Sequence, residues 1–225
     1  MEKLSPQCRA LAESGNYYSA WKASQKEGRG TMADEQPWLS YAAIDHLNRF
    51  VRSDMKVFEY GGGGSTLYFT NRTASVVTVE HNPEWFVLLG KEMKSRGKNN
   101  WQGHLIPGEP GRTKGAAISD PNAYVSDDAD NADKNFRAYA SSIDQFADEY
   151  FDIVLVDGRS RPSCTKHGIP KLKKGGWLII DNSDRDYYLE AFRKKLAADF
   201  ETVLHCKGPT PYCTWFTQTS IWKKR

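Results

Sequence analysis

Four consecutive glycines, Gly61 to Gly64, constrain the fold of this chain more than any other feature of its sequence. They follow the apolar run Val57–Tyr60 and precede the segment Ser65–Phe69. Glycine lets the backbone turn sharply and approach a neighbour closely, and hydroxyl side chains cap helices well. The sequence therefore predicts a strand, a tight loop and a helix in direct succession, with backbone N–H groups at the start of the helix.

The same alternation of strand and helix continues along the chain. Further strands are predicted at residues 76–80, 151–157, 177–181, 201–206 and 214–222, and helices at residues 83–93, 136–146, 165–172 and 187–198. Short apolar runs separated by helical patterns are typical of a parallel sheet covered on both faces. We therefore predict an α/β protein: a three-layer α/β/α, Rossmann-like, mostly parallel sheet with an antiparallel hairpin at its C-terminal end.

The 225 residues fit one full-sized domain with additions. Residues 1–50 are predicted to form a helical extension or lid, and residues 51–225 the main domain. Within that domain, residues 104–135 interrupt the alternation with proline, glycine and a cluster of Asp and Asn. Long excursions of this kind are usually functional or disordered, and this one is expected to be a surface insertion.

Composition narrows the class of protein. The mean hydropathy is −0.66 and no apolar run is long enough to cross a membrane, so we expect a protein with no membrane partner. The first residues do not resemble a secretory signal, and cytoplasmic localisation is therefore expected. Four cysteines, at positions 8, 164, 206 and 213, match no metal or redox spacing and are expected to be thiols.

Acidic residues close three of the predicted strands: Glu59, Glu80 and Asp157. Ligands of such sheets bind beyond the carboxyl ends of the strands. Glu59 would repel a pyrophosphate, which disfavours a dinucleotide, whereas Glu80 has the spacing of an acid that accepts hydrogen bonds from ribose hydroxyls. Together the two acids favour a nucleoside that carries positive charge.

The segments Val57–Leu67 and Val77–Asn82 resemble the first two motifs of class I S-adenosylmethionine (SAM)-dependent methyltransferases. The resemblance extends to the strand before Asp157, to the Gly175-Gly176 turn and to the final hairpin. One departure is Ser65, which stands where the third glycine of the family's loop is often found. Because a small hydroxyl residue can cap the helix, SAM binding is still expected.

The resemblance implies a binding site for SAM. Glu59 and the glycine loop would hold the methionine part of SAM, Glu80 the ribose, and His81 would lie beside the adenine. The residues expected to bind the cofactor are Glu59, Gly61, Gly62, Gly63, Ser65, Thr66, Glu80 and His81.

Two neighbouring strands are followed by Asp157 and by Asp181-Asn182, which is similar to the metal site of cation-dependent O-methyltransferases. Asp157, Asp181 and Asn182 carry the hard oxygen ligands that Mg²⁺ prefers. That family places a lysine after its first Asp, whereas this chain has Arg159 and Arg161. The alternative is that Asp181-Asn182 caps the strand and Arg161 pairs with an acid. If no metal binds, Asp157 is the candidate base.

The substrate side of the site is less constrained. Trp38, Tyr41 and Tyr139 are candidate substrate-lid residues, with core packing as the alternative for each, and Arg159 is a candidate substrate clamp. Residues 159–225 contain fourteen Lys and Arg but only six Asp and Glu. This excess of positive charge is the basis for the hypothesis of an anionic substrate. Asp157 and Arg161 are the expected catalytic residues.

We expect a SAM-dependent methyltransferase that acts on an oxygen or nitrogen of a small molecule. The expected partners are that substrate and SAM, with Mg²⁺ as the candidate metal, no nucleic acid, and a monomer or homodimer as the assembly. The glycine loop also resembles that of aminopropyltransferases, although two arginines near Asp157 would repel a polyamine. A non-catalytic SAM-binding protein is the remaining alternative.

Overall fold

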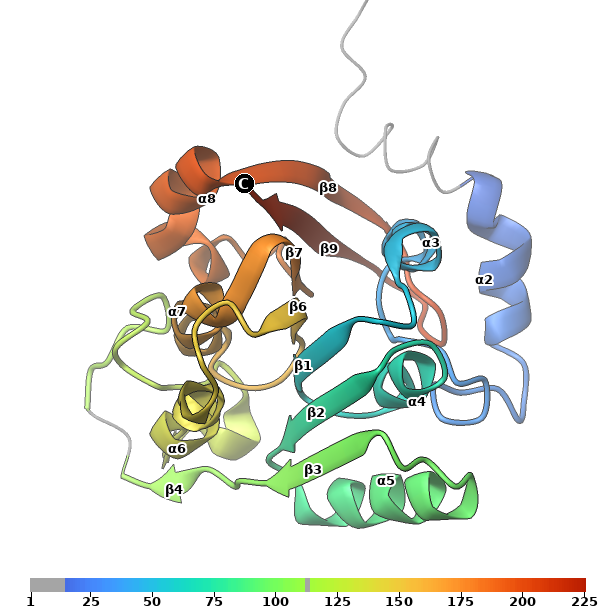
Figure 1. Cartoon of the computed structure of the whole chain (residues 1–225), viewed down its shortest axis with the longest axis horizontal. Coiled ribbons are helices and arrows are strands. Elements are labelled where there is room, and N and C mark those ends of the chain that lie inside the picture. The colour runs from blue at the N-terminus through green and yellow to red at the C-terminus, as the bar shows by residue number, and fades with distance from the viewer. Residues whose placement is uncertain (1–14, 112–113) are drawn as a thin grey trace, which may run out of the picture.

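The computed structural model describes residues 15–111 and 114–225. Its principal sheet has seven strands in the order β3-β2-β1-β6-β7-β9-β8 (Figure 1). The strands are β1 (Lys56–Tyr60), β2 (Ser75–Glu80), β3 (Trp101–Leu105), β6 (Phe151–Val156), β7 (Leu172–Ile180), β8 (Phe200–Pro209) and β9 (Phe216–Lys224). A separate two-stranded ladder pairs β4 (Glu109–Pro110) with β5 (Lys134–Asn135).

The first five strands of the sheet are parallel, and β9 is antiparallel to both β7 and β8. Strand order reverses beside β1, which pairs with β2 on one side and with β6 on the other. The loops after these strands open at the same edge of the sheet, which is where a ligand binds in such folds. The predicted fold class, with its mostly parallel sheet and antiparallel C-terminal hairpin, is confirmed.

Helices cover both faces of the sheet (Figure 1). On one side lie α3 (Tyr41–Phe50), α4 (Gly64–Thr70) and α5 (Pro83–Ser95), with α2 (Tyr18–Ser24) beyond α3; on the other lie α6 (Arg137–Ser141), α7 (Arg161–Lys171) and α8 (Arg193–Asp199). Short 3-10 turns complete the chain at Gly15–Tyr17, Ala129–Asn131, Ser142–Gln145, Asp186–Tyr188 and Glu190–Phe192.

Alternate residues of each strand supply the two halves of the core. Val57 and Ile153 pack toward α3 and α4, whereas Phe58 and Val154 pack toward α6, α7 and α8. Successive side chains of a strand point to opposite faces, so a strand buried on both faces is apolar without interruption. This is the reason that the run Phe151–Val156 looks continuously hydrophobic in the sequence.

Several elements differ from the sequence-based predictions. Residues 187–198 form two 3-10 turns and the short helix α8 instead of one helix, and α7 begins at Arg161 rather than near Thr165. Within the predicted insertion, residues 109–110 pair with 134–135, and the backbone N–H of Phe136 donates to the carbonyl of Tyr124. Among the described residues, no helix is long and apolar enough to span a membrane.

Cys164, Cys206 and Cys213 form no disulfide within the described ranges, and Cys8 lies outside them.

Candidate functional site

A cavity of about 670 Å³ opens at the carboxyl ends of β1, β2, β6 and β7. Its size falls in the range of small-molecule sites. The glycine loop, Glu80, His81, Asp157, Arg159, Arg161, Asp181 and Asn182 all contribute to its wall. The fold thus brings together, in one cavity, most of the residues that the sequence analysis selected from separate segments.

The glycines of the loop differ in how closely their surroundings pack against them. Gly61 has a φ of +87°, and a Cβ there would meet the backbone of Asp157 at 3.0 Å. A Cβ on Gly64 would overlap the carbonyl oxygens of Thr31 and Gln36, so α4 can begin only with a glycine against that segment. Gly63 has more room, since its nearest neighbour is the indole of Trp85 at 3.5 Å.

Glu59 does not line the cavity, contrary to the role that the resemblance implies. It is fully buried beneath the loop, where Ser65 donates to Oε2 (2.8 Å) and Thr78 donates to Oε1 (2.7 Å). Thr66, also fully buried, donates to Oε1 as well and accepts from the N–H of Gly63 (2.9 Å). Burial raises the pKa of Glu59 to about 7, although these hydroxyl donors oppose the shift. Glu59 and Thr66 brace the loop from below.

Glu80, in contrast, is placed to receive a ligand. Its Oε1 accepts from the backbone N–H groups of His81 (2.7 Å) and Asn82 (2.8 Å), and Oε2 accepts from that of Gly62 (3.1 Å). Burial alone would raise the pKa of Glu80, but hydrogen bonds from His81 and Asn82 outweigh it and lower the pKa. Glu80 is therefore ionised, and Oε2 keeps capacity for a further donor at the cavity wall.

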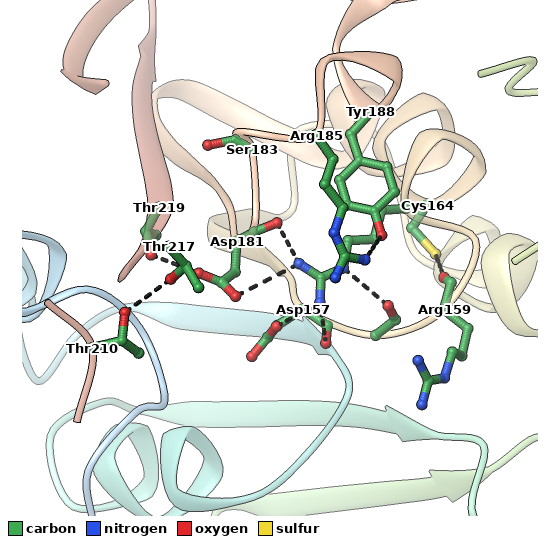
Figure 2. A network of polar contacts seen from close by, with 12 residues as sticks. Asp157, Arg159, Cys164, Asp181, Ser183, Arg185, Tyr188, Thr210, Thr217 and Thr219 are labelled. Carbon is green, nitrogen blue, oxygen red and sulfur yellow. Dashed lines mark hydrogen bonds and ion pairs between the residues drawn. The ribbon is translucent and has the colours of Figure 1, made fainter. Parts of the chain in front are cut away.

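Arg161 lies between the two carboxylates that close β6 and β7. Its Nη2 is 3.0 Å from Oδ1 of Asp157, and its Nη1 is 3.7 Å from Oδ2 of Asp181. The guanidinium also donates to the backbone carbonyls of Asp157, Gly158 and Asp181. Asp157 and Asp181 thus converge on this guanidinium, and Figure 2 shows the side chain of Arg159 lying apart from both carboxyl groups. The sequence-based alternative in which Arg161 pairs with an acid matches this geometry.

The two carboxyl groups interact with each other as well. Burial, followed by the nearby charge of Asp181, raises the pKa of Asp157 well above its usual range, although Arg161 opposes the shift. Burial also raises the pKa of Asp181, against the effects of Arg161 and of the Thr219 hydroxyl, which donates to its Oδ1 at 2.6 Å. Asp157 keeps 24% of its side chain exposed to the cavity. Such a carboxyl group can take up a proton from a ligand bound beside it.

The residues at the carboxyl ends of β6 and β7 do not fit the Mg²⁺ site that the sequence analysis considers. Within the described residues, no group of three His, Cys, Asp or Glu side chains could hold a metal ion. Asp157 and Asp181 are present, as expected, but the guanidinium of Arg161 stands between them and supplies the positive charge. A cation bound there would meet Arg161 directly, so the Mg²⁺ prediction is not supported.

The remaining wall of the cavity comes from segments that the sequence analysis did not select, apart from Trp38. Trp38 and Trp215 are 48% and 59% exposed, and both line this region together with Asp184 and Arg185. Thr31, Thr210, Cys213, Phe216 and Thr217 also contribute. These residues occur in no recognisable motif, and only the fold brings the segments around residues 31–38 and 210–217 to one place.

Two expected substrate-lid residues lie elsewhere. Tyr139 is fully buried beneath the site, with its ring 5.6 Å from that of Tyr60, and Tyr41 is 9% exposed within the core that includes α3. The prediction of a lid role for these two residues is corrected, because both rings fill the space between sheet and helix. The alternative interpretation, that both are core residues, fits the structure.

Solved structures that resemble this protein share one fold. No protein-family model and no curated protein matches the sequence. An O-methyltransferase from Bacillus cereus in complex with S-adenosylhomocysteine (SAH) is similar in structure, with a TM-score of 0.56, 15% identity, and coverage of 99% of this chain and 93% of that one.

Two further structures show the same likeness. A Streptococcus mutans protein described as a methyltransferase, in complex with SAH, has a TM-score of 0.55 and 13% identity over 82% of this chain and 96% of that one. An rRNA methylase from Streptococcus thermophilus has a TM-score of 0.53 and 13% identity over 82% of this chain and 95% of that one. The fold of this chain is therefore that of class I SAM-dependent methyltransferases.

Proposed function

We propose that this protein is a SAM-dependent methyltransferase that transfers a methyl group to an oxygen or nitrogen of a small molecule. The observation that carries the proposal is the position and charge of Glu80. It is an ionised, buried carboxylate whose Oε2 retains acceptor capacity at the wall of a cavity of about 670 Å³, beside the glycine loop. A carboxylate in this position suits a ribose, as it does in other nucleoside sites of parallel sheets.

The remaining residues around the cavity fit the other parts of SAM. Gly62 and Gly63 present the backbone to a ligand without obstructing side chains, and His81 lies next to Glu80. When bound, SAM supplies an electrophilic methyl group on a sulfonium, and transfer in line to the acceptor breaks the carbon–sulfur bond and leaves SAH. The work of the protein is to orient the acceptor and to exclude water.

Asp157 is proposed as the base for an acceptor that must lose a proton. As the acceptor oxygen or nitrogen forms its bond to the methyl carbon, its proton passes to the carboxylate of Asp157. The guanidinium of Arg161, 3.0 Å from Asp157, fixes the orientation of that carboxylate and offsets the negative charge of the pair of acids. In this proposal Arg161 supplies the charge that a divalent cation supplies in a metal-dependent site.

The acceptor is proposed to lie beyond Asp157, between Trp38 and Trp215 and near Arg185. Indole rings offer a flat apolar surface for a ring-shaped substrate, and Arg185 has donors for an anionic or hydroxyl group. RNA is the second candidate acceptor, because the similar structures include an rRNA methylase. A small molecule is favoured, since the cavity of about 670 Å³ has the size of a small-molecule site.

The first test is calorimetric titration of the protein with SAH. Micromolar affinity is expected, and Glu80→Gln should weaken it by about ten- to a hundredfold, because a charged acceptor is lost. Glu84→Gln, an exposed glutamate on α5, is the matched control and should leave the affinity unchanged. If wild-type protein shows no heat of binding, the proposal is wrong.

The second test follows labelled methyl groups from SAM into a cell extract separated into small molecules and RNA. Label in the small-molecule fraction, lost in Asp157→Asn but with SAH affinity retained, supports the proposal. Label in RNA selects the second candidate acceptor. SAH binding without any transfer favours a non-catalytic SAM-binding protein, and transfer of an aminopropyl group from decarboxylated SAM would favour an aminopropyltransferase.

A further inference from the structure

The acidic cluster of the insertion contacts two arginines that line the cavity: Asp127 pairs with Arg185, and Asp128 pairs with Arg159. Asp128 precedes the 3-10 turn at Ala129–Asn131, and its Oδ2 accepts from Nδ2 of Asn131 (2.5 Å) while its Oδ1 accepts from the N–H of Asp130 (3.4 Å). Burial would raise the pKa of Asp128, but the hydrogen bond from Asn131 and the charge of Arg159 lower it. Asp128 is therefore an ionised carboxylate held in a fixed orientation.

Asp128 is connected to the nucleoside end of the cavity through Arg159. Oδ2 of Asp128 lies 3.2 Å from Nη2 of Arg159, and Nε of Arg159 donates to Nε2 of His81 at 3.1 Å. The backbone of Arg159 is itself held, since its carbonyl accepts from the thiol of Cys164 (Figure 2). One guanidinium thus joins an acid of the insertion to the residue that follows Glu80.

This contact selects the tautomer of His81. A guanidinium can only donate, so Nε2 of His81 must accept, and the proton of the neutral imidazole must lie on Nδ1. Nδ1 is 2.7 Å from Oε1 of Glu80. Oε1 of Glu80 thus accepts from two backbone N–H groups and has this buried imidazole nitrogen close beside it, although Nδ1 forms no well-directed hydrogen bond among the described residues, and Oε2 is the oxygen with capacity for a ligand.

We propose that Asp128 is a positioning residue for the nucleoside subsite, acting through Arg159 and His81 on Glu80. It contacts no part of the bound nucleoside itself. Exposed ion pairs contribute little to stability, and the side chains of Arg159 and Asp128 are 34% and 22% exposed. The role of the pair is to orient the guanidinium and, through it, to fix the imidazole. This inference rests on the proposed function of the cavity as a SAM site.

The test is SAH titration of Asp128→Asn in the full chain. We expect the dissociation constant to rise about three- to tenfold, in the range of coupling between contacting groups. Asp130→Asn is the matched control: it makes the same change of charge two residues away, on an exposed side chain, and should leave the affinity within twofold of wild type. Asp128→Glu should recover part of the loss.

A double-mutant cycle and a spectroscopic measurement distinguish this role from a structural one. In an Arg159→Gln background, Asp128→Asn should cause no further loss of SAH affinity. In ligand-free protein, nitrogen NMR should show the Nδ1–H tautomer of His81 for wild type and Asp130→Asn, and a mixture of tautomers for Asp128→Asn. Thermal unfolding of all variants should be similar.

Each outcome bears on one conclusion. Equal SAH affinity of wild type and Asp128→Asn, or an undiminished loss in the Arg159→Gln background, overturns the inference and leaves the proposed function intact. A wild-type protein that does not bind SAH overturns the proposed function and this inference with it. An Nε2–H tautomer of His81 in the wild type would also contradict the inference.

Discussion

At the scale of single residues, Arg161 balances the charge of the two carboxyl groups that follow β6 and β7. It is 8% exposed and forms the positive partner of Asp157 and Asp181. A buried charge left without its partner is strongly destabilising, typically by about 3–5 kcal/mol. The two carboxyl groups would then need either protons or another cation.

Removal of Arg161 should therefore create a response to divalent metal. Arg161→Ala is expected to unfold at a lower temperature than wild type, and millimolar MgCl₂ should restore part of the loss, because two carboxylates are then left for the ion. Wild-type protein should show no such stabilisation, and its methyl transfer should survive treatment with EDTA. Thermal scans with and without MgCl₂ measure both effects. A wild-type protein that is stabilised by MgCl₂ would contradict this account of the pair.

Glu59 gives a second prediction, about pH. Its pKa rises from 4.5 in the unfolded chain to about 7 in the folded protein, so the folded state holds a proton that the unfolded chain releases. The stabilisation is fully present below pH 4.5 and is lost as the pH rises to about 7. Relative to Glu59→Gln, the free energy of unfolding of wild type should fall by about 3 kcal/mol across this window.

Urea unfolding of both proteins between pH 4.5 and pH 8 measures the difference. Comparison of the two curves removes the contributions of other titrating groups, including Asp157. Parallel curves would show that Glu59 is charged throughout, stabilised by its three hydroxyl donors.

At the scale of the elements, the loop between β1 and α4 combines structural and binding roles. Gly64→Ala should destabilise the protein by about 3 kcal/mol, because the added methyl group overlaps the backbone of Thr31 and Gln36 and neither can move easily. Gly63→Ala should remain close to wild type in stability, since the nearest atom is 3.5 Å away in a side chain, but should weaken SAH binding. Chemical unfolding and calorimetry separate the two effects, and equal stability of the two variants would contradict the assignment.

The loop between β6 and α7 packs against the side chain of Tyr139. A Cβ on Gly158 would overlap the hydroxyl of Tyr139, which is fully buried and has no hydrogen-bond partner among the described residues. Tyr139→Phe should therefore be neutral or stabilising, and it should relieve part of the destabilisation caused by Gly158→Ala. A double-mutant cycle by urea unfolding measures this coupling, and additive effects of the two changes would contradict it.

The elements also show what the sequence could and could not predict. Strand ends and the glycine loop were predictable because apolar runs, glycine and terminal acids mark them locally; the positions of Glu80, Asp157 and Asp181 followed from them. The burial of Glu59 was not predictable, because it depends on hydroxyl groups of β2 and α4 that only the packed loop brings together. The positions of Trp215 and Arg185 in the cavity wall could not be predicted, because no local sequence pattern marks them.

At the scale of the whole molecule, an N-terminal segment is fastened to the turn between β8 and β9. Nε1 of Trp21 donates to the carbonyl of Cys213 at 2.8 Å, and the hydroxyl of Tyr212 donates to Oδ2 of Asp34 at 2.8 Å. The ring of Trp21 also meets that of Phe216 edge-on, with centroids 5.9 Å apart. Trp38 and Cys213, which both line the cavity, lie in the segments that these contacts join.

Trp21→Ala should loosen both attached segments together. Hydrogen exchange followed by mass spectrometry should show faster exchange in residues 31–38 and 208–217, because both lose the same anchor, and unchanged exchange in residues 57–82. SAH affinity should be unchanged. Faster exchange confined to the N-terminal segment would show that the turn between β8 and β9 is held by other contacts.

The contact between Trp21 and Cys213 affects the order in which parts of the molecule fold. Glu80 and the glycine loop lie within 26 residues of each other along the chain, at residues 57–82, whereas Trp21 and Cys213 are separated by 192 positions. Contacts distant in sequence close late in folding because chain closure must come first. On a ribosome, the glycine loop and Glu80 are synthesised well before residue 213, whereas the contact between Trp21 and Cys213 cannot form until that residue has been made. A newly made chain would thus complete the segment proposed to bind SAM first and the segments proposed to contact the acceptor last.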